Sequence, residues 1–377
     1  MRQLLIILKK ELVDAIRDKR SVMAGLYYSI GTPLIISLLF MVLIGKVTAP
    51  DTLRLTIIEP ERAPDLVRYL TAHNIEHSSD STKKDIEISF SENYAQQLNQ
   101  GLPAEVFVKA DFSDNELQQA LSRIRRTMDG YAHEIGRLRL VARGVDPRVT
   151  QVLDVQQQDT AKAVARGGFI LGMAIFIMIY SVFISGMNLA IDTSAGERER
   201  DSLGLMLSQP VTPMTITWAK VLCVTLFAML GLVLTIVCSK IAYTFVPWHE
   251  LGFDVNINSD LVIAMFIVGI PISLMAASMQ LFVSFMAKTF KEAQSYLTIV
   301  LFVPLALAMT ANYEIAPHVL KWLPVSGQQQ ALMALVKGQE LPILELAVAS
   351  GITLVIALVL TFAINRLLKS EKVVFGL

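Results

Sequence analysis

The sequence contains little charge and no excess of either sign. Only 18% of its 377 residues are Asp, Glu, Lys or Arg, whereas ordinary soluble domains carry about a quarter. The 33 basic and 33 acidic side chains cancel, so there is no surplus of positive charge to neutralise phosphates. We therefore exclude nucleic acid as a partner and expect a non-aqueous environment to account for the missing charge.

Cysteine is equally scarce. The two cysteines, Cys223 and Cys238, lie in one hydrophobic run. They are fifteen positions apart, which corresponds to roughly 22 Å of helix and is well beyond the reach of a disulfide bond. The sequence therefore excludes a disulfide framework and a thiolate metal site, and we expect this chain to bind no metal and no cofactor of its own.

Long runs without any charged residue explain the composition. A helix that crosses a bilayer needs about 20 consecutive apolar residues. Six runs reach or approach this length without Asp, Glu, Lys or Arg: 21–45, 167–191, 221–239, 261–287, 293–312 and 346–365. The fold class we predict is an α-helical polytopic membrane protein with six transmembrane helices.

Basic residues indicate the orientation, because short cytoplasmic segments are enriched in Lys and Arg. Six basic residues precede the first run, and the loops after the second and fourth runs carry several more. The loop 247–260 carries none. We expect a multi-pass protein of the bacterial inner membrane with both termini in the cytoplasm.

The first 20 residues have a helical apolar stripe of their own. Leu5, Leu8, Leu12 and Ile16 fall on one face, which predicts an amphipathic helix along the inner membrane surface over residues 1–20. An ordinary cytoplasmic stub is the alternative. A cleaved signal peptide is excluded, because the following uncharged run, 21–45, is too long.

Residues 46–166 are polar and predict an α/β domain inserted between the first two spans, on the outer face. Strands are expected over 53–58, 85–90 and 104–109, with helices over 61–73, 91–100 and 113–143. The stretch from His73 to His77 matches the H-x-x-E-H pattern of some zinc peptidases. The match is short, so a membrane-anchored peptidase is a minor alternative and solvent-exposed histidines are the default.

The remaining region, 167–377, holds spans 2–6 and a cytoplasmic loop, 192–220, with two helix signals. Ser194 and Glu197 have the spacing of a capping box, so a short helix is expected to begin at Ser194. Leu203, Met206 and Leu207 form an apolar face before the proline at 210 ends the helix. Such a helix suits docking into a cytoplasmic partner; a helix that floats on the lipid headgroups is the alternative.

The same loop resembles the motif G-E-[KR]-E-R-x-x-L-x-x-L-L-x-x-P-V of type-2 ABC transporter permeases, although Gly204 replaces a usually bulky residue. The plan of the whole chain is similar to the NatB branch, the permease subunits of sodium-extruding ABC exporters. The resemblance implies a NatA-like ABC ATPase subunit as partner, ATP and Mg on that partner, and a second copy of this chain in a homodimer. It assigns contact with the ATPase to Gly196, Glu197, Arg198, Glu199, Arg200, Leu203, Leu207 and Pro210.

The sequence contains no G-x-x-x-x-G-K-[ST] phosphate loop, which fits a transport subunit that is not itself an ATPase. Two polar stripes within the spans are candidates for the translocation path; the alternative is that they only join helices. They comprise Ser181, Ser185 and Asn188 in span 2, and Ser273, Gln280 and Ser284 in span 4.

The cargo is the least determined part of the prediction. Sodium follows from the resemblance alone, and a drug, a lipid or a peptide is the alternative, since a bare cation in hydrocarbon is costly without a carboxylate. A non-transporting sensor, whose outer domain binds a ligand, is a further alternative.

Overall fold

The structure is a computed structural model that describes residues 2–48, 52–77, 86–150, 167–251, 255–312 and 318–370. The chain divides into two compact units, which we call the membrane unit and the α/β unit. The membrane unit comprises Met1–Ile44 and Thr160–Leu377, and the α/β unit comprises Gly45–Asp159.

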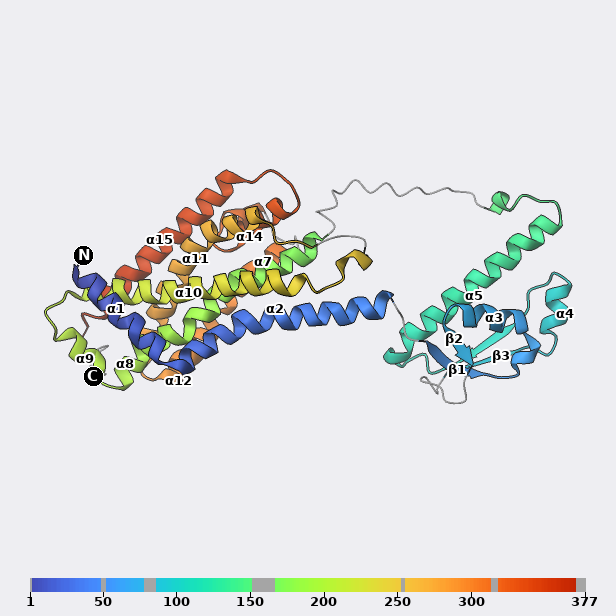
Figure 1. Ribbon diagram of the computed structural model, residues 1–377, viewed down its shortest axis with the longest axis horizontal. Helices are drawn as coiled ribbons and strands as arrows, with labels where there is room; N and C mark the ends of the chain where they lie inside the picture. The colour runs from blue at the N-terminus through green and yellow to red at the C-terminus, as the bar shows by residue number, and fades with distance from the viewer. Residues whose placement is uncertain are drawn as a thin grey trace. The chain divides into compact units, whose positions relative to one another are not determined.

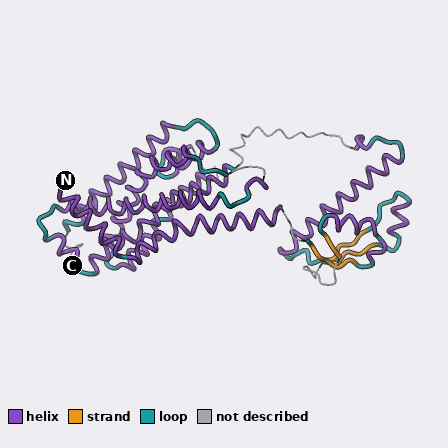
Figure 2. The backbone as a smooth tube through the Cα atoms, in the orientation of Figure 1, coloured by secondary structure: helices purple, strands orange, loops and turns teal. Residues whose placement is uncertain are grey.

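The membrane unit is helical and contains six helices long and apolar enough to cross a bilayer (Figures 1 and 2). This number agrees with the six runs in the sequence. The unit opens with α1 (Arg2–Arg17), which packs beside α10 (Figure 1). Its further helices are α2 (Lys19–Thr48), α7 (Gly168–Ile191), α10 (Pro213–Tyr243), α11 (Ser259–Met286), α12 (Phe290–Val300), α13 (Phe302–Asn312), α14 (Ser326–Val336) and α15 (Ile343–Leu367).

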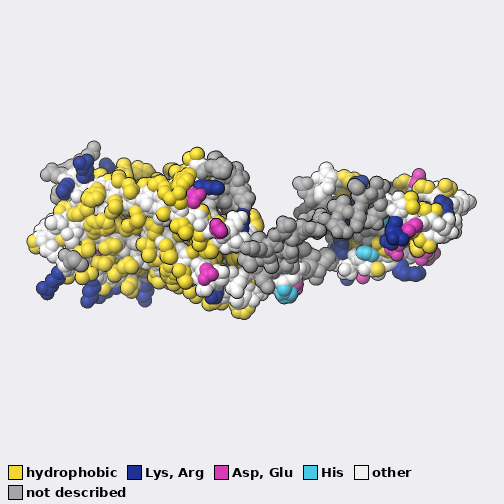
Figure 3. All heavy atoms as spheres, turned by 90° about the horizontal axis from the view of Figure 1, so that it is seen from above, with side chains coloured by type: hydrophobic (Ala, Val, Ile, Leu, Met, Phe, Trp, Pro, Cys, Tyr) yellow, Lys and Arg dark blue, Asp and Glu magenta, His cyan; other side chains and the backbone are white. Residues whose placement is uncertain are grey.

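Hydrophobic and basic side chains occupy different parts of the surface of the membrane unit. Figure 3 shows a broad hydrophobic surface over the helices, with Lys and Arg side chains gathered at the end that carries α1 and α9 (Ser202–Leu207). An apolar belt next to a basic end is the pattern expected of a protein that spans a bilayer.

The fifth span is broken rather than continuous. Helix α12 ends at Val300, and α13 begins at Phe302. Pro304 lies four residues after Val300. Proline has no N–H to bond the carbonyl four residues earlier, and its ring collides with that carbonyl. Pro33 and Pro271, in contrast, lie inside α2 and α11 without ending them.

The helix before the last span buries polar side chains. Helix α14 packs against α7, α13 and α15, and its polar residues Ser326, Gln328 and Gln329 are fully buried. Gln328 finds partners there: its Oε1 accepts from the Val325 N–H at 2.8 Å, and its Nε2 donates to Thr353 Oγ1 at 3.2 Å. Partners inside the helix packing therefore stabilise the buried amide of Gln328, whereas the amide of Gln329 is buried without a hydrogen-bond partner among the described residues.

The α/β unit is built on a four-stranded sheet in the order β2-β1-β3-β4. Strand β1 pairs in parallel with both β2 and β3, and β3 pairs antiparallel with β4. The elements are β1 (Leu53–Ile57), α3 (Pro64–Ala72), β2 (Ile75–His77), β3 (Glu87–Phe90), α4 (Tyr94–Asn99), β4 (Val106–Lys109) and α5 (Asn115–Ala142).

One apolar core holds this unit together. Leu55 and Ile88 from the strands are fully buried with Leu70 of α3 and Ile124 of α5. Burying each such side chain contributes about 1.5–3 kcal/mol. The inward side chains of the strands and the apolar stripes of α3 and α5 therefore form one core.

The helix ends of this unit show where sequence signals were misread. The expected cap Ser113 does not cap α5, because its hydroxyl donates to Asp111 Oδ1 at 2.6 Å instead. The helix expected from residue 61 begins only at Pro64, whose fixed φ suits a first helical position. The stop at Gly144 is confirmed, since its φ of +70° is the left-handed value that ends helices.

Candidate functional site

The loop that joins α7 to α10 begins differently from the prediction. Helix α7 continues through a π-helical turn, Asp192–Gly196, into the short helix α8 (Glu197–Glu199). Ser194 therefore lies inside a helix and caps nothing. Its hydroxyl contacts the Ala190 carbonyl of the preceding turn at 2.5 Å and Ser284 Oγ of α11 at 2.6 Å, so the capping-box interpretation was wrong.

The second part of the loop is helix α9, which ends before Pro210. Asp201 in the left-handed region, with φ 54°, turns the chain between α8 and α9. Leu203 is fully buried among residues of α1, α10 and α11, and Leu207 packs against the same cluster. The apolar face of α9 thus packs inward rather than facing a partner. Leu205, 71% exposed, is the apolar side chain that the helix presents outward.

The start of α10 follows its sequence signals. Thr212 caps the helix by accepting a hydrogen bond from the Thr215 N–H, and Pro213 occupies the first turn. Because α10 begins this early, Lys220 lies two turns inside the helix rather than in a solvated loop. Its side chain is fully buried, although this position falls in the cytoplasmic loop, 192–220, that is expected from the sequence.

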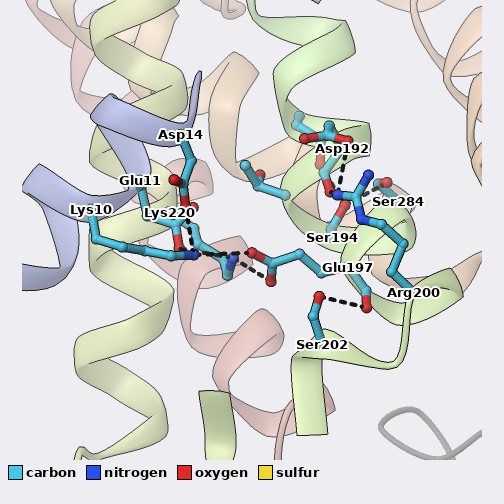
Figure 4. Close-up of polar contacts among 12 residues, drawn as sticks. Lys10, Glu11, Asp14, Asp192, Ser194, Glu197, Arg200, Ser202, Lys220 and Ser284 are labelled. Carbon is cyan, nitrogen blue, oxygen red and sulfur yellow. Dashed lines mark hydrogen bonds and ion pairs between the residues drawn. The ribbon is translucent and has the colours of Figure 1, made fainter. Parts of the chain in front are cut away.

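A network of charged side chains surrounds Lys220 (Figure 4). Its Nζ lies 2.7 Å from Glu197 Oε2 and 3.2 Å from Glu11 Oε1 of α1. The side chains of Glu11 and Glu197 are 1% and 9% exposed. Lys10 lies on the outer side of this network, with its Nζ 3.3 Å from Glu11 Oε1 and 3.6 Å from Glu197 Oε1. Burial opposes the charge of Lys10, but the two carboxylates more than offset this and raise its pKa.

Other contacts fasten the loop to the opposite side. Arg198 donates to the Ala287 carbonyl at 3.0 Å, and Glu199 accepts the Phe290 N–H at the start of α12. Arg200 pairs with Asp192 at 3.0 Å within the loop itself (Figure 4). The loop is therefore held between α1 and α10 on one side and the α11–α12 junction on the other.

A pocket of about 600 Å³ opens between α1 and this loop. Ile6 and Ile7 of α1 form one wall, while Leu205 and Met206 of α9 form the other. Lys10 and Glu197 also line it, so the pocket combines apolar walls with two charged groups. The remaining lining residues are Gln3, Ser202, Gln209, Pro210, Val211 and Ile216.

The eight residues assigned by resemblance therefore fall into two sets. Those on the outside are Glu199, Arg200 and Pro210. Those inside or partly inside are Gly196, Glu197, Arg198, Leu203 and Leu207. Sequence reasoning did not identify Glu11, Lys220 or Leu205 as residues of the site. For Glu11 and Lys220 a signal was present, because each is a charged residue at an inward position of its helix, α1 or α10.

Three of the six residues in the polar stripes of the second and fourth spans join neighbouring helices. Ser185 Oγ lies 2.9 Å from Ser29 Oγ of α2, and Gln280 donates to the Phe183 carbonyl of α7. Ser284 is the partner of Ser194. Ser181 and Ser273 bond carbonyls of their own helices, and Asn188 is half-buried. These contacts favour the helix-joining alternative, and a role in translocation stays a prediction.

The histidine pattern in the α/β unit does not form a metal site. His73 ends α3, and His77 lies in strand β2, so the two are not on one helix face. His77 Nδ1 accepts the Ile57 N–H at 3.0 Å. Within the described residues, no group of three or more His, Cys, Asp or Glu side chains is placed to hold a metal ion.

Comparison with known proteins gives two matches. The family described as ABC-2 family transporter protein matches residues 24–365. The chain is 25% identical over 311 residues to the ABC transporter permease protein NatB of Bacillus subtilis (strain 168), covering 79% of this chain and 80% of that protein. No solved structure matches.

Proposed function

Because this chain belongs to the ABC-2 family of transporter proteins, it is a permease subunit of an ABC transporter, and we propose that it extrudes Na⁺ with energy from a separate ATPase. The family and the six candidate spans carry the first part of this statement. Sodium rests on the similarity to a protein named NatB, at 25% identity. ATP and Mg²⁺ are bound by the partner in this proposal, and a second copy of the chain completes the transporter.

The proposed orientation places α1, α8 and α9 in the cytoplasm and the α/β unit outside. Its support is the basic end of the membrane unit, which carries α1 and α9 (Figure 3). Leu5 and Ile16 of α1 are 62% and 67% exposed, which suits an amphipathic helix on the inner leaflet of the bacterial inner membrane. Labelling of engineered cysteines in intact cells would test both positions.

The ATPase docks, in this proposal, into the pocket between α1 and α9. The supporting observation is the apolar pocket with Leu205 on its rim, next to exposed Glu199 and Arg200. Covering an exposed leucine with a partner removes apolar surface from water, which favours binding. Glu197→Lys would be a poor test, because it would bury a third ammonium beside Lys220 and Lys10.

Leu205→Asp is the sharper test of docking. We expect it to abolish co-purification of a NatA-like ATPase from mild detergent while the permease stays folded. Val149→Asp is the matched control, since Val149 is also 71% exposed but lies in the α/β unit. ATPase recovery that is unchanged by Leu205→Asp, or lost equally in both variants, would contradict docking at this pocket.

Sodium transport is tested in inverted membrane vesicles, whose cytoplasmic face points outward, with ATP added to the outside medium. We expect uptake of ²²Na⁺ that requires both this chain and its ATPase. Uptake of a lipophilic dye instead of sodium would favour export of a drug, a lipid or a peptide. Ligand binding by the α/β unit without movement of any cargo would favour the sensor.

A further inference from the structure

Three segments far apart in the sequence meet at one buried ammonium group. Lys220 belongs to α10, Glu11 to α1, and Glu197 to the loop helix α8. Both carboxylates lie within 3.2 Å of Lys220 Nζ. In Figure 4 the three side chains point toward one another from three separate ribbons.

The surroundings enclose the ammonium group of Lys220 and the carboxylate of Glu11. The side chain of Lys220 is 0% exposed. Ala15 of α1, Leu203 of α9 and Val224 of α10 form part of the apolar cluster at this end of the membrane unit. Away from water, charge-assisted hydrogen bonds are strong, and separating them leaves an unpaired buried charge. The three segments are therefore fastened to one another directly rather than through solvent.

Stability alone does not require charges here, because apolar side chains of similar volume often pack as well as a buried ion network. What charges add is a fixed arrangement, since each carboxylate must face the ammonium group. This matters most for the loop, whose side toward α1 is otherwise bordered by the open pocket.

We propose that Lys220 is a positioning residue that makes α1, the loop helices and the inner end of α10 move as one body. This inference rests on the proposed function, in which the ATPase displaces the loop. Glu197, although part of the motif, then faces inward and holds the loop, while the exposed residues of the loop meet the partner. Displacement of α9 is carried to α10 through Lys220 and to α1 through Glu11.

Distances between spin labels test this without knowledge of the cargo. Labels are introduced as unnatural amino acids at Leu5 of α1, Ser208 after α9 and Val359 of α15, all exposed. The full transporter with its ATPase is measured without nucleotide and after trapping with ATP and vanadate, with labelled chain diluted in unlabelled chain. We expect the Leu5–Ser208 distance to stay constant while the Ser208–Val359 distance changes.

Glu11→Gln is the informative variant, since the amide keeps the shape of the side chain and removes its charge. We expect the ATPase to remain bound and Ser208 to move on trapping, but Leu5 no longer to follow it. Asp14→Asn is the control: Asp14 is half exposed and pairs with Lys10 of its own helix, so α1 should still follow the loop. Lys220→Arg, which keeps the charge, should behave as the native chain does.

The outcomes separate this inference from the proposed function. If the native Leu5–Ser208 distance changes on trapping as much as Ser208–Val359, the segments do not move as one body and the inference is wrong. It is also wrong if Glu11→Gln leaves α1 following the loop. If the native chain binds no ATPase, the proposed function is wrong instead.

Discussion

Ion pairs occur in both units of this protein, but their environments are opposite. In the α/β unit, Arg68–Asp65 and Arg148–Asp146 have side chains 49–86% exposed. In the membrane unit, Lys220 pairs with Glu11 and Glu197 at 0–9% exposure. Exposed pairs contribute little because water solvates the separated charges equally well. Buried pairs cannot be separated without leaving a charge in an apolar medium.

The comparison shows where ion pairs hold elements of this chain together. Helices α3 and α5 hold their sheet through apolar contacts, and the ion pairs around them are incidental to that core. The segments α1, α8 and α10 meet through charges that the sequence keeps inside. Substitutions should therefore have small effects on the surface of the α/β unit and large effects at the inner end of the membrane unit.

The largest effect is expected for Lys220→Met. It leaves Glu11 and Glu197 buried without their shared cation, at a cost of about 3–5 kcal/mol. Thermal unfolding in detergent would show a much lower midpoint or a loss of folded protein. Lys240→Met, at an exposed position of the same helix, should leave the midpoint nearly unchanged. Equal midpoints for both variants would remove the contrast between buried and exposed charge.

Gly231→Ala should come next. A Cβ at Gly231 would overlap the Ser185 side chain of α7, and overpacking of this kind costs about 1–3 kcal/mol. Gly351→Ala on α15 is the control, because nothing lies within 4 Å of its added Cβ. A midpoint for Gly231→Ala at or above that of Gly351→Ala would show that α7 and α10 are not packed this closely.

Gly136→Ala, in the α/β unit, is expected to increase stability rather than to decrease it. Gly136 lies within α5, with open space around an added Cβ. Alanine is the better helix former, so the variant should gain about 0.5–1 kcal/mol in the unfolding of this unit. Protease resistance of the unit reports this gain, and increased cleavage would contradict it.

The smallest effect is expected at Asp146. Hydrogen bonds from Arg148 lower the pKa of Asp146 below its ordinary value of 3.8. A lowered carboxyl pKa adds stability above the unfolded pKa, and this stability is lost as the pH falls through the folded pKa. Asp146→Asn should differ slightly from the native chain at pH 7 and not at all well below pH 3.8. A large difference at pH 7 would show that this surface pair is structural.

Much of the architecture follows from local sequence. Six uncharged runs predict six spans because about 20 consecutive apolar residues make a helix long enough to cross the hydrocarbon core, and six candidate spans are present within the described residues. The strands near residues 53, 87 and 106 follow their alternating pattern, and Thr212 with Pro213 marks the start of α10. Strand β2 was missed because its three residues, Ile75–His77, are too few for a period to show.

The sequence predicted where along the chain the candidate site lies, but not how its side chains are arranged. The loop was located from its motif, yet its expected cap Ser194 is a helix-interior residue and its expected contact residue Glu197 faces inward. Sequence spacing describes neighbours along one helix. It contains no information on Lys220, 23 residues from Glu197 and 209 from Glu11.

By itself, then, the sequence determined that the protein has several spans and an α/β unit after the first span, because hydropathy and period act locally; its role as a permease followed from the resemblance of its loop motif to a known family. Only the tertiary structure decided which charged residues are solvated and which are buried. That difference depends on how α1, α8 and α10 pack together, and a charge is retained inside only where packing brings it a partner of opposite sign.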